Sequence, residues 1–256
     1  MQKTAISDII ESKRHRKLSM LTCYDYSFAR LLNGRVDMIL VGDSLGNVIL
    51  GYDRTTQVTM ADMVRHIGAV RRGAPDTLII GDMPAGSYDE FSSAIANARR
   101  LVDAGADAVK PEGRPKIVRA LTDAGFSVMG HLGYLPQTAP AFKVVGRDDD
   151  EALQLQQDAL GIQKAGAFSV VLECLPSATA KTLTAELTIP TIGIGAGAGC
   201  DGQVLVLYDL LGLFTDFKPK FVRQYADLAQ QVRDAVDAYV HDVCENNFPG
   251  NEEEYH

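Results

Sequence analysis

Three carboxylates stand shortly after apolar runs of the chain: Asp43, Asp82 and Glu112. Apolar runs of this length are typical of buried parallel strands, whose carboxyl ends meet at one edge of a sheet. Three carboxylates gathered there would repel one another unless a cation lay among them. Because no histidine or cysteine pattern accompanies these oxygens, they favour a hard ion such as Mg2+. The alternative is that each acid caps the turn or helix after its strand.

Three further titratable side chains stand at corresponding places: Lys110, His131 and Glu173. A proline follows Lys110 and cannot donate to a central ladder, so the strand is expected to end there. Such a lysine could balance an anionic substrate or stabilise an enolate, or serve only in a structural ion pair. Glu173 ends a strongly apolar run, where burial raises a carboxyl pKa toward that of a general base; a buried carboxylate bound to loop amides is the alternative. His131 is open to a structural and to a catalytic interpretation.

Eight apolar segments alternate with helical patterns, which predicts a closed (β/α)8 TIM barrel, an α/β fold, rather than an open sheet. At three places an Ala-Gly pair ends a helical pattern just before the next strand, as left-handed glycine would. Thr59 and Asp62 form a capping box that predicts the start of one helix. A short helix is expected over Thr4–Ser12, a long amphipathic helix over Lys220–Val243, and a mobile acidic tail from Asn246 on. The predicted strands cover residues 18–22, 38–41, 77–82, 107–110, 127–131, 169–173, 191–194 and 203–207.

The overall composition favours small-molecule chemistry in a single domain. The chain has 256 residues and a net charge of -8, and its basic residues form no cluster. This length suits one barrel over residues 1–256, and the charge argues against nucleic acid or an anionic membrane as a partner. The four cysteines form no Cys-x-x-Cys pair, and no apolar run suits a signal peptide or membrane helix. We therefore expect reduced thiols in a cytoplasmic protein.

Two stretches are rich in glycine. Leu132–Arg147 is long and also contains proline, which predicts a loop over the mouth of the barrel or only a surface connection. Gly193–Gly199 lacks the Gly-x-Gly-x-x-Gly spacing and opens no clear helix. We therefore interpret it as a tight loop after the seventh strand, in which backbone amides could approach a ligand, rather than as a dinucleotide site.

Several blocks of the sequence, taken together, resemble the ketopantoate hydroxymethyltransferase family. They follow one another in order over nearly the whole chain. The resemblance implies a (β/α)8 barrel of the phosphoenolpyruvate-mutase/isocitrate-lyase type. The blocks are Leu21–Phe28, Val41–Gly46, Arg71–Pro75, Val109–Gly113, Gly130–Gly133, Leu172–Pro176, and Gly193–Gly197 with Asp201–Gln203.

The resemblance also implies an activity, in which a hydroxymethyl group passes from 5,10-methylenetetrahydrofolate to 3-methyl-2-oxobutanoate. The product would be ketopantoate, for pantothenate and coenzyme A synthesis. Mg2+ chelated by the substrate would stabilise the enolate formed when a base removes the C3 proton. Carried onto matching positions, the implied Mg2+ ligands are Asp43, Asp82 and Glu112, the proton acceptor is Glu173, and the oxoacid contacts are Asp43, Ser44, Asp82 and Lys110, with His131 beside them.

The sequence departs from the family pattern in two places. Pro111 stands where an aliphatic residue is usual, and the loop around Thr138–Lys143 is shorter than usual. These departures bear on the closing loop and the folate contacts rather than on the metal ligands. The family also implies a homo-oligomer, often a decamer.

Two other functions stay open at this point. One is a Mg2+-dependent oxoacid lyase or mutase of the same superfamily; such enzymes commonly carry a nucleophilic cysteine in a mobile loop, and Leu132–Arg147 contains none. The other is a barrel without catalytic activity that binds a metal or an oxoacid.

Overall fold

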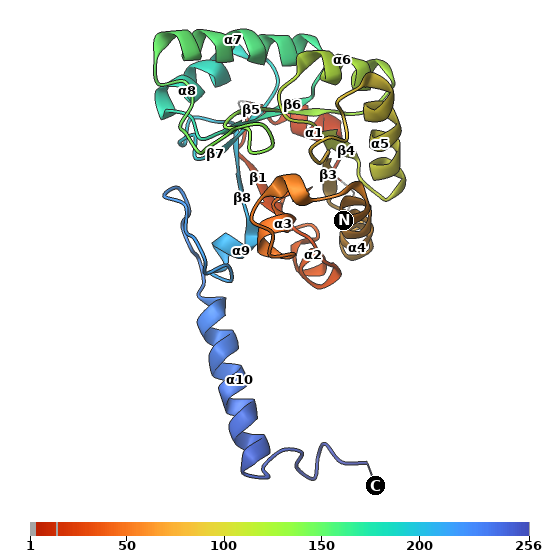
Figure 1. Cartoon of the computed structure of the whole chain (residues 1–256), viewed down its shortest axis with the longest axis vertical. Helices are drawn as coiled ribbons and strands as arrows, with labels where there is room; N and C mark the ends of the chain where they lie inside the picture. Colours follow the sequence, from red (N-terminus) through yellow and green to blue (C-terminus); the bar gives the residue numbers. More distant parts are fainter. Residues whose placement is uncertain (1–3, 14, 256) are drawn as a thin grey trace. The chain divides into compact units, whose positions relative to one another are not determined.

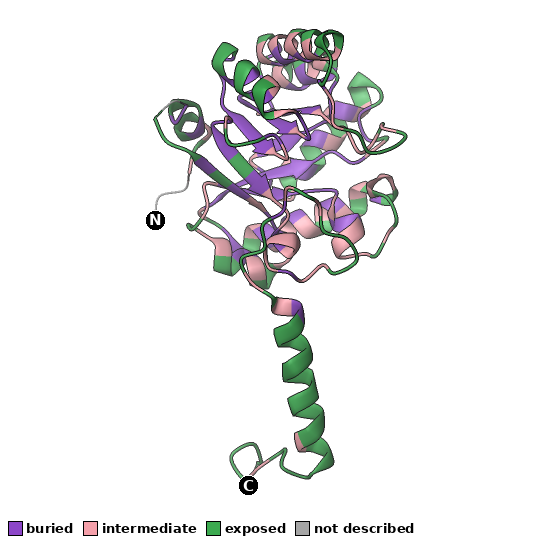
Figure 2. Ribbon diagram, turned by 90° about the vertical axis from the view of Figure 1, so that its left-hand side faces the viewer, coloured by how far each residue is buried: buried purple, intermediate pink, exposed green. Residues whose placement is uncertain are grey.

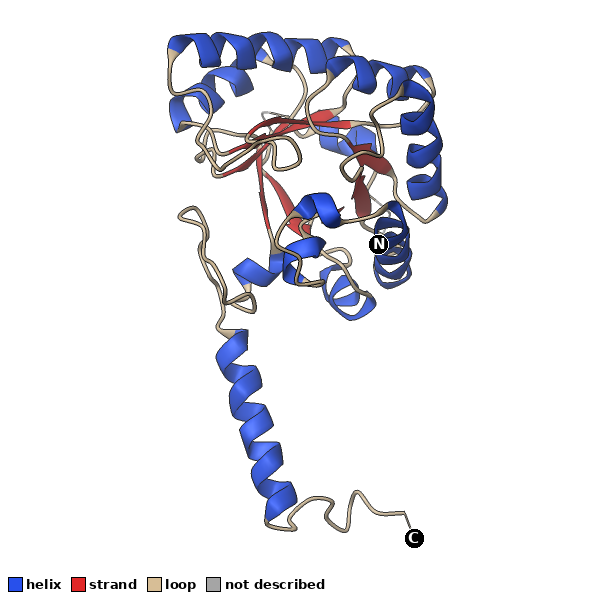
Figure 3. Ribbon diagram, in the orientation of Figure 1, coloured by secondary structure: helices blue, strands red, loops and turns tan. Residues whose placement is uncertain are grey.

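Eight parallel strands form the centre of the protein in the computed structural model, which describes residues 4–13 and 15–255. The strands are β1 (Leu18–Thr22), β2 (Met38–Val41), β3 (Leu78–Asp82), β4 (Ala108–Lys110), β5 (Met129–Gly133), β6 (Ser169–Glu173), β7 (Thr191–Ile194) and β8 (Gly202–Leu205). They pair in the order β4-β3-β2-β1-β8-β7-β6-β5. A parallel bridge between Val109 and Val128 joins the two ends of this sheet. The predicted barrel is therefore confirmed, and Figure 1 and Figure 3 show its strands surrounded by helices.

The helix α1 (Ile6–Glu11) precedes the first strand, and α3 (Leu45–Val48) lies in the connection after β2. The other helices of the barrel each lie between successive strands: α2 (Tyr26–Leu32), α4 (Met60–Gly73), α5 (Phe91–Asp103), α6 (Pro115–Asp123), α7 (Asp149–Lys164) and α8 (Ser177–Glu186). The capping box at the start of α4 is confirmed, because the Thr59 hydroxyl accepts from the Asp62 amide and the Asp62 carboxylate accepts from the Thr59 amide. The glycines of the three Ala-Gly pairs have φ angles of 121°, 86° and 96°. These left-handed residues end α5, α6 and α7 just before the following strand.

The interior of the barrel is apolar. Every residue of β2 and β3 is buried, as expected of strands covered on both faces, and Figure 2 shows burial concentrated on the strands. Met20, Met38, Ile80 and Ile192 belong to one buried cluster in the interior. Ile9 of α1 is fully buried in the same cluster, so the short helix before the first strand packs on this core.

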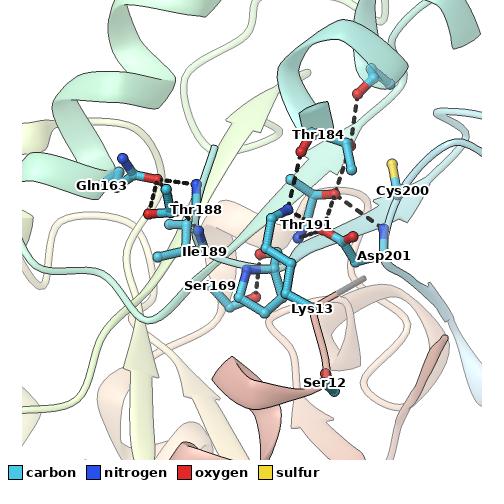
Figure 4. A network of polar contacts seen from close by, with 12 residues as sticks. Ser12, Lys13, Gln163, Ser169, Thr184, Thr188, Ile189, Thr191, Cys200 and Asp201 are labelled. Carbon is cyan, nitrogen blue, oxygen red and sulfur yellow. Dashed lines mark hydrogen bonds and ion pairs between the residues drawn. The ribbon is translucent and has the colours of Figure 1, made fainter. Parts of the chain in front are cut away.

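A network of buried polar groups occupies the amino end of the barrel, between α1, α8 and the starts of β7 and β8 (Figure 4). The Lys13 ammonium donates to Asp201 Oδ2 at 2.7 Å and to the Thr184 carbonyl at 3.0 Å. Asp201 Oδ2 also accepts from the amide of Thr191 at 2.9 Å and from its hydroxyl at 3.2 Å. This network ties residues before the first strand to the last two strands.

Several elements differ from their predicted extents. β5 spans Met129–Gly133, two residues later at both ends than predicted, so His131 lies inside the strand rather than at its end. The predicted loop after β2 contains two short helices, α3 and the 3-10 helix η1 (Thr55–Gln57), and β8 begins and ends earlier than expected, at Gly202–Leu205. The last long helix begins at Leu228 rather than at Lys220, because the Asp227 side chain caps it by accepting from the Gln230 amide. Residues 1–3 and 256 of the predicted domain, and residue 14 of its basic linker, lie outside the described residues.

The chain divides into two compact units, Met1–Val206 with the barrel strands and Leu207–His256. The second unit contains α9 (Leu207–Leu210) and α10 (Leu228–Cys244). Apolar side chains of α10 are about half exposed, Val232 and Val236 at 52% and Val240 at 50%. In the described part of the chain, helices combining the length and apolar character of a membrane span are absent. That residues 1–256 form a single domain stays a prediction.

Candidate active site

The six titratable side chains singled out in the sequence lie at the carboxyl end of the barrel. Asp82, Lys110 and Glu173 are the last residues of β3, β4 and β6, and His131 lies within β5. Asp43 and Glu112 each follow two residues after the end of a strand. Because all eight strands run parallel, these ends open at one mouth. The contacts among the six side chains show how closely they approach one another.

The segment after β2 brings Asp43 and Ser44 against β3. The amide of Asp43 donates to Asp82 Oδ2 at 3.0 Å. The approach depends on Gly42: a Cβ on this residue would lie 2.9 Å from Ser44 Oγ and 3.3 Å from Asp82 Oδ2. The Ser44 hydroxyl lies 2.8 Å from that of Tyr24, in the segment after β1. The absence of a side chain on Gly42 therefore allows the segment after β2 to approach the end of β3.

A buried ion pair joins β3 and β4. The Lys110 ammonium lies 2.8 Å from Asp82 Oδ1, and the two side chains are only 5% and 6% exposed. Among the described residues, Asp82 Oδ1 has no hydrogen-bond partner of good geometry, so its polar contact is this ion pair. An anionic oxygen with a single cationic neighbour retains the capacity to take a further cation.

His131 connects the lysine to Glu173. Its Nδ1 lies 3.4 Å from the Lys110 ammonium and its Nε2 lies 3.1 Å from Glu173 Oε2. Nδ1 also lies 3.6 Å from Glu112 Oε1. Because an ammonium has only donors, the contact with Lys110 requires Nδ1 to accept, and in that tautomer Nε2 carries the hydrogen that bonds to Glu173. The next residue, Cys174, has a φ of 52°, which turns the chain sharply after β6. The Glu173 side chain is 20% exposed, so it reaches the open side of the mouth.

Glu112 meets the loop between β5 and α7. Its Oε2 accepts from the amide of Gln137 at 3.1 Å, and its own amide donates to the Tyr88 hydroxyl at 3.3 Å. The Gln137 side chain continues to Asp43, where Nε2 donates to Oδ2 at 2.9 Å. The predicted loop over the mouth thus places one residue between two of the predicted metal ligands.

Burial dominates the electrostatics of the mouth. It raises the pKa of Asp43 to about 7, and the charge of Asp82 adds to the rise. Burial likewise raises the pKa of Glu112 to about 8 and that of Glu173 to about 7, although Lys110 acts to lower both. These carboxyl groups therefore titrate near neutral pH, which is the range useful to a general base.

The two nitrogen bases of the mouth shift in opposite directions. Burial lowers the pKa of His131 well below its ordinary value, and the charge of Lys110 lowers it further, so the ring stays neutral. Burial also opposes the charge on Lys110, but the carboxylates of Asp82, Glu112 and Asp43 outweigh it and raise the Lys110 pKa. The mouth thus holds a permanent cation among several carboxyl groups.

The donor chemistry of the mouth fits a hard cation, but the ligands are not assembled. Asp82 Oδ1 is buried with one cationic neighbour, and burial raises the carboxyl pKa values of Asp43 and Glu112. Within residues 4–13 and 15–255, however, no group of three His, Cys, Asp or Glu side chains lies close enough to hold a metal ion. The structure brings the predicted ligands to one mouth without gathering them around a point, and the metal set stays a prediction.

Three residues of the site were missed in the sequence: Tyr24, Tyr88 and Gln137. Tyr24 and Gln137 did carry a signal, since one follows β1 and the other lies in the predicted mouth loop. Their side chains reach Ser44 and Asp43 over 20 and 94 residues of chain. Tyr88 lies between β3 and α5 and had no distinguishing pattern.

Comparisons with known proteins cover nearly the whole chain. A protein-family sequence model described as ketopantoate hydroxymethyltransferase matches residues 3–251. The 3-methyl-2-oxobutanoate hydroxymethyltransferase of Heliobacterium modesticaldum is 51% identical over 95% of this chain and 91% of its own. The enzyme of the same name from Desulfotalea psychrophila is 51% identical over 97% of this chain and 92% of its own.

A solved structure supports the fold. The structure of 2,3-dimethylmalate lyase, a member of the PEP mutase/isocitrate lyase superfamily, superposes with a TM-score of 0.62 over 99% of this chain and 92% of the other. The identity of 15% limits this likeness to the fold. The fold of the barrel is therefore similar to that of this solved superfamily member, in agreement with the type of barrel that the resemblance implied.

Proposed function

The chain belongs to the ketopantoate hydroxymethyltransferase family, and we propose that it transfers a hydroxymethyl group to 3-methyl-2-oxobutanoate to form ketopantoate. Ketopantoate leads to pantothenate and so to coenzyme A. The observation that carries the reaction chemistry is the linked set of Lys110, His131 and Glu173, which places a cation and a carboxyl group of pKa about 7 at one mouth. We propose 5,10-methylenetetrahydrofolate as the one-carbon donor.

In the proposed reaction Glu173 removes the C3 proton of the oxoacid. A carboxyl group with a pKa of about 7 is substantially ionised at neutral pH yet basic enough to take a proton from carbon. His131 donates from Nε2 to Glu173 Oε2, which holds the carboxylate in one orientation. The C3–H electrons form the new bond to the one-carbon unit, whose two bonds to folate nitrogens break. Water supplies the hydroxyl group, and the C3 proton held by Glu173 and the second proton of the water go to the two nitrogens as tetrahydrofolate leaves.

The remaining residues bind the oxoacid and its charge. Lys110 supplies a fixed positive charge for the carboxylate and for the oxygen that becomes negative during proton removal. Ser44, held by Tyr24, offers a hydroxyl to the same ligand. We propose that Asp43, Asp82 and Glu112 hold Mg2+, which when bound would stabilise negative charge on the substrate oxygens. The raised pKa values of Asp43 and Glu112 support a cation at this place.

Proton exchange in D2O tests the assignment of Glu173. With Mg2+ and 3-methyl-2-oxobutanoate but no folate, NMR should show loss of the C3 proton signal. Glu173→Gln should slow this loss by about 10²–10⁴-fold, the usual contribution of a general base, while calorimetry shows oxoacid binding nearly intact. Glu186→Gln is the matched control, because Glu186 is an exposed glutamate of α8.

Two results would contradict the proposal. Proton exchange that persists in Glu173→Gln would show that another residue is the base. Joint loss of proton exchange and oxoacid binding would show that Glu173 has a structural role. If the unaltered protein exchanges no proton under any Mg2+ concentration, the alternative of a barrel that binds an oxoacid without catalysis is favoured.

Assembly and location complete the proposal. We propose a homo-oligomer, of the decameric kind frequent in this family, acting in the cytoplasm on small-molecule substrates. The described cysteines support a reducing compartment, since Cys23, Cys174, Cys200 and Cys244 are all free thiols. Light scattering on the purified protein would measure the oligomeric state.

A further inference from the structure

The residue that lies between the predicted metal ligands is neutral and belongs to a loop. Gln137 comes from the connection between β5 and α7 and is partly exposed. Its main-chain amide donates to Glu112 Oε2 at 3.1 Å, and its side-chain amide donates to Asp43 Oδ2 at 2.9 Å. One residue therefore presents two N–H dipoles to two buried carboxyl groups.

The other polar atoms of the Gln137 side chain are also bonded. Nε2 donates a second hydrogen to the carbonyl of Met83 at 3.0 Å, and Oε1 accepts from the hydroxyl of Tyr88. Asp43, Met83, Tyr88 and Glu112 come from the segments that follow β2, β3 and β4. Gln137 thus fastens the loop to three successive strand ends.

The tip of the loop is built so that it can leave as a unit. Its turn closes on itself, because the amides of Thr138 and Ala139 donate to the Leu135 carbonyl at 3.1 Å and 2.9 Å. Those bonds do not involve the mouth. The partly exposed Gln137 amide would regain hydrogen bonds from water on leaving, whereas the buried Met83 carbonyl and Tyr88 hydroxyl would each lose this partner, a cost that the ion must outweigh.

A cation bridging Asp43 and Glu112 would compete for the same oxygens. A divalent ion compensates two buried carboxylates far more strongly than two N–H dipoles do. In residues 4–13 and 15–255 no three acidic, histidine or cysteine side chains lie close enough to form a metal cluster. The two amide groups of Gln137 therefore occupy carboxylate oxygens that the ion would need.

We propose that Gln137 is a displaceable placeholder for the cation: it bonds to both Asp43 and Glu112 before the ion binds and would be expelled when these carboxylates hold the ion. This inference rests on the metal site of the proposed function. Because the loop would open when the ion binds, metal binding and access of the oxoacid to the mouth are coupled. The apparent affinity for the metal is therefore the intrinsic affinity multiplied by the fraction of molecules in which Gln137 is not bridged.

Titration calorimetry with MgCl2 alone tests the competition. If the bridged form outweighs the open form about ten to one, Gln137→Ala should bind Mg2+ about tenfold more tightly than the unaltered protein. Thr138→Ala is the matched control, because it changes the exposed neighbour in the same turn and should stay within twofold. Equal or weaker Mg2+ binding by Gln137→Ala would overturn the inference.

Hydrogen exchange gives a second readout that needs no variant. In the unaltered protein, saturating Mg2+ should speed exchange of the Gln137 amide, measured in a peptide that spans residues 134–140, since this amide loses its bond to Glu112. Slower exchange on adding Mg2+ would mean that Gln137 closes over the ion, which contradicts the inference. Mg2+ binding that is equal in both proteins refutes only the placeholder, whereas absence of binding in both removes the metal site as well.

Discussion

Two buried lysine–aspartate pairs stand at opposite ends of the barrel. Lys13 and Asp201 meet at 2.7 Å at the amino end, with side chains 7% and 9% exposed. Lys110 and Asp82 meet at 2.8 Å at the carboxyl end, with side chains 5% and 6% exposed. The pairs are nearly equal in distance and burial, so their surroundings must account for any difference in role.

At the amino end the neighbours are neutral and saturate the pair. Asp201 Oδ2 accepts from the amide and hydroxyl of Thr191, and Lys13 also donates to the Thr184 carbonyl (Figure 4). At the carboxyl end the neighbours are further carboxyl groups, Asp43 and Glu112, whose pKa values burial raises to about 7 and about 8. A saturated pair stabilises the fold, whereas an unsaturated one keeps capacity for a cation and a ligand.

Breaking the amino-end pair should have the largest effect on stability. Lys13→Met leaves the buried Asp201 carboxyl without its cation, which costs about 3–5 kcal/mol of unfolding free energy. Proton exchange by the folded fraction should stay unchanged, because the mouth lies at the other end of the strands. Urea unfolding and the D2O assay measure the two effects. A loss of stability below about 1 kcal/mol would show that Thr191 alone satisfies Asp201.

Breaking the carboxyl-end pair should instead reduce activity. Lys110→Met removes the charge that stabilises the developing oxyanion, and exchange should fall about 10²–10³-fold, or about 3–4 kcal/mol of activation free energy. Its loss of stability should be smaller than that of Lys13→Met, since the neighbouring carboxyl groups can bind protons. Lys116→Met, an exposed position of α6, is the control. A larger stability loss than in Lys13→Met would contradict the comparison.

The pH dependence of stability sharpens the comparison further. The pKa values of Asp43 and Glu112 are raised, so between about pH 4 and 8 the folded protein holds protons that the unfolded chain releases. Without Mg2+, stability should therefore fall as pH rises, by at most about 1.4 kcal/mol per pH unit for each group. Urea midpoints at pH 5 and 8 in chelator measure it, and Asp43→Asn should flatten the slope. A rising profile would contradict the burial of these carboxyl groups.

The smallest effect is expected from a neutral member of the amino-end network. Thr191→Val removes a hydroxyl that bonds to Asp201 and lies 2.7 Å from the hydroxyl of Thr184. The same hydroxyl accepts from the Asp201 amide at 3.2 Å. Losing these neutral hydrogen bonds in a buried site costs about 1–3 kcal/mol, less than losing the cation. Thermal or urea unfolding measures it. An effect equal to that of Lys13→Met would mean that the network acts as one unit.

Local signals predicted the fold well. The Thr59–Asp62 capping box and the three Ala-Gly turns depend only on residues near in sequence, and both occur as predicted. The predicted start of the last helix was wrong because apolar residues at helical spacing extend to the N-terminal side of it. The helix itself begins only after Asp227, whose side chain caps it. Boundaries of this kind depend on single side-chain bonds rather than on periodicity.

The sequence by itself determined which residues stand at the strand ends, because the alternation of apolar runs and turns is local. Only the tertiary structure decided what each of them meets. Lys13 reaches Asp201 across 188 residues and Gln137 reaches Asp43 across 94, and such contacts exist only once the strands close into a barrel. The same closure surrounds one lysine–aspartate pair with hydrogen-bonding groups and leaves the other able to bind a further cation. The difference depends on neighbouring side chains that are distant in the sequence.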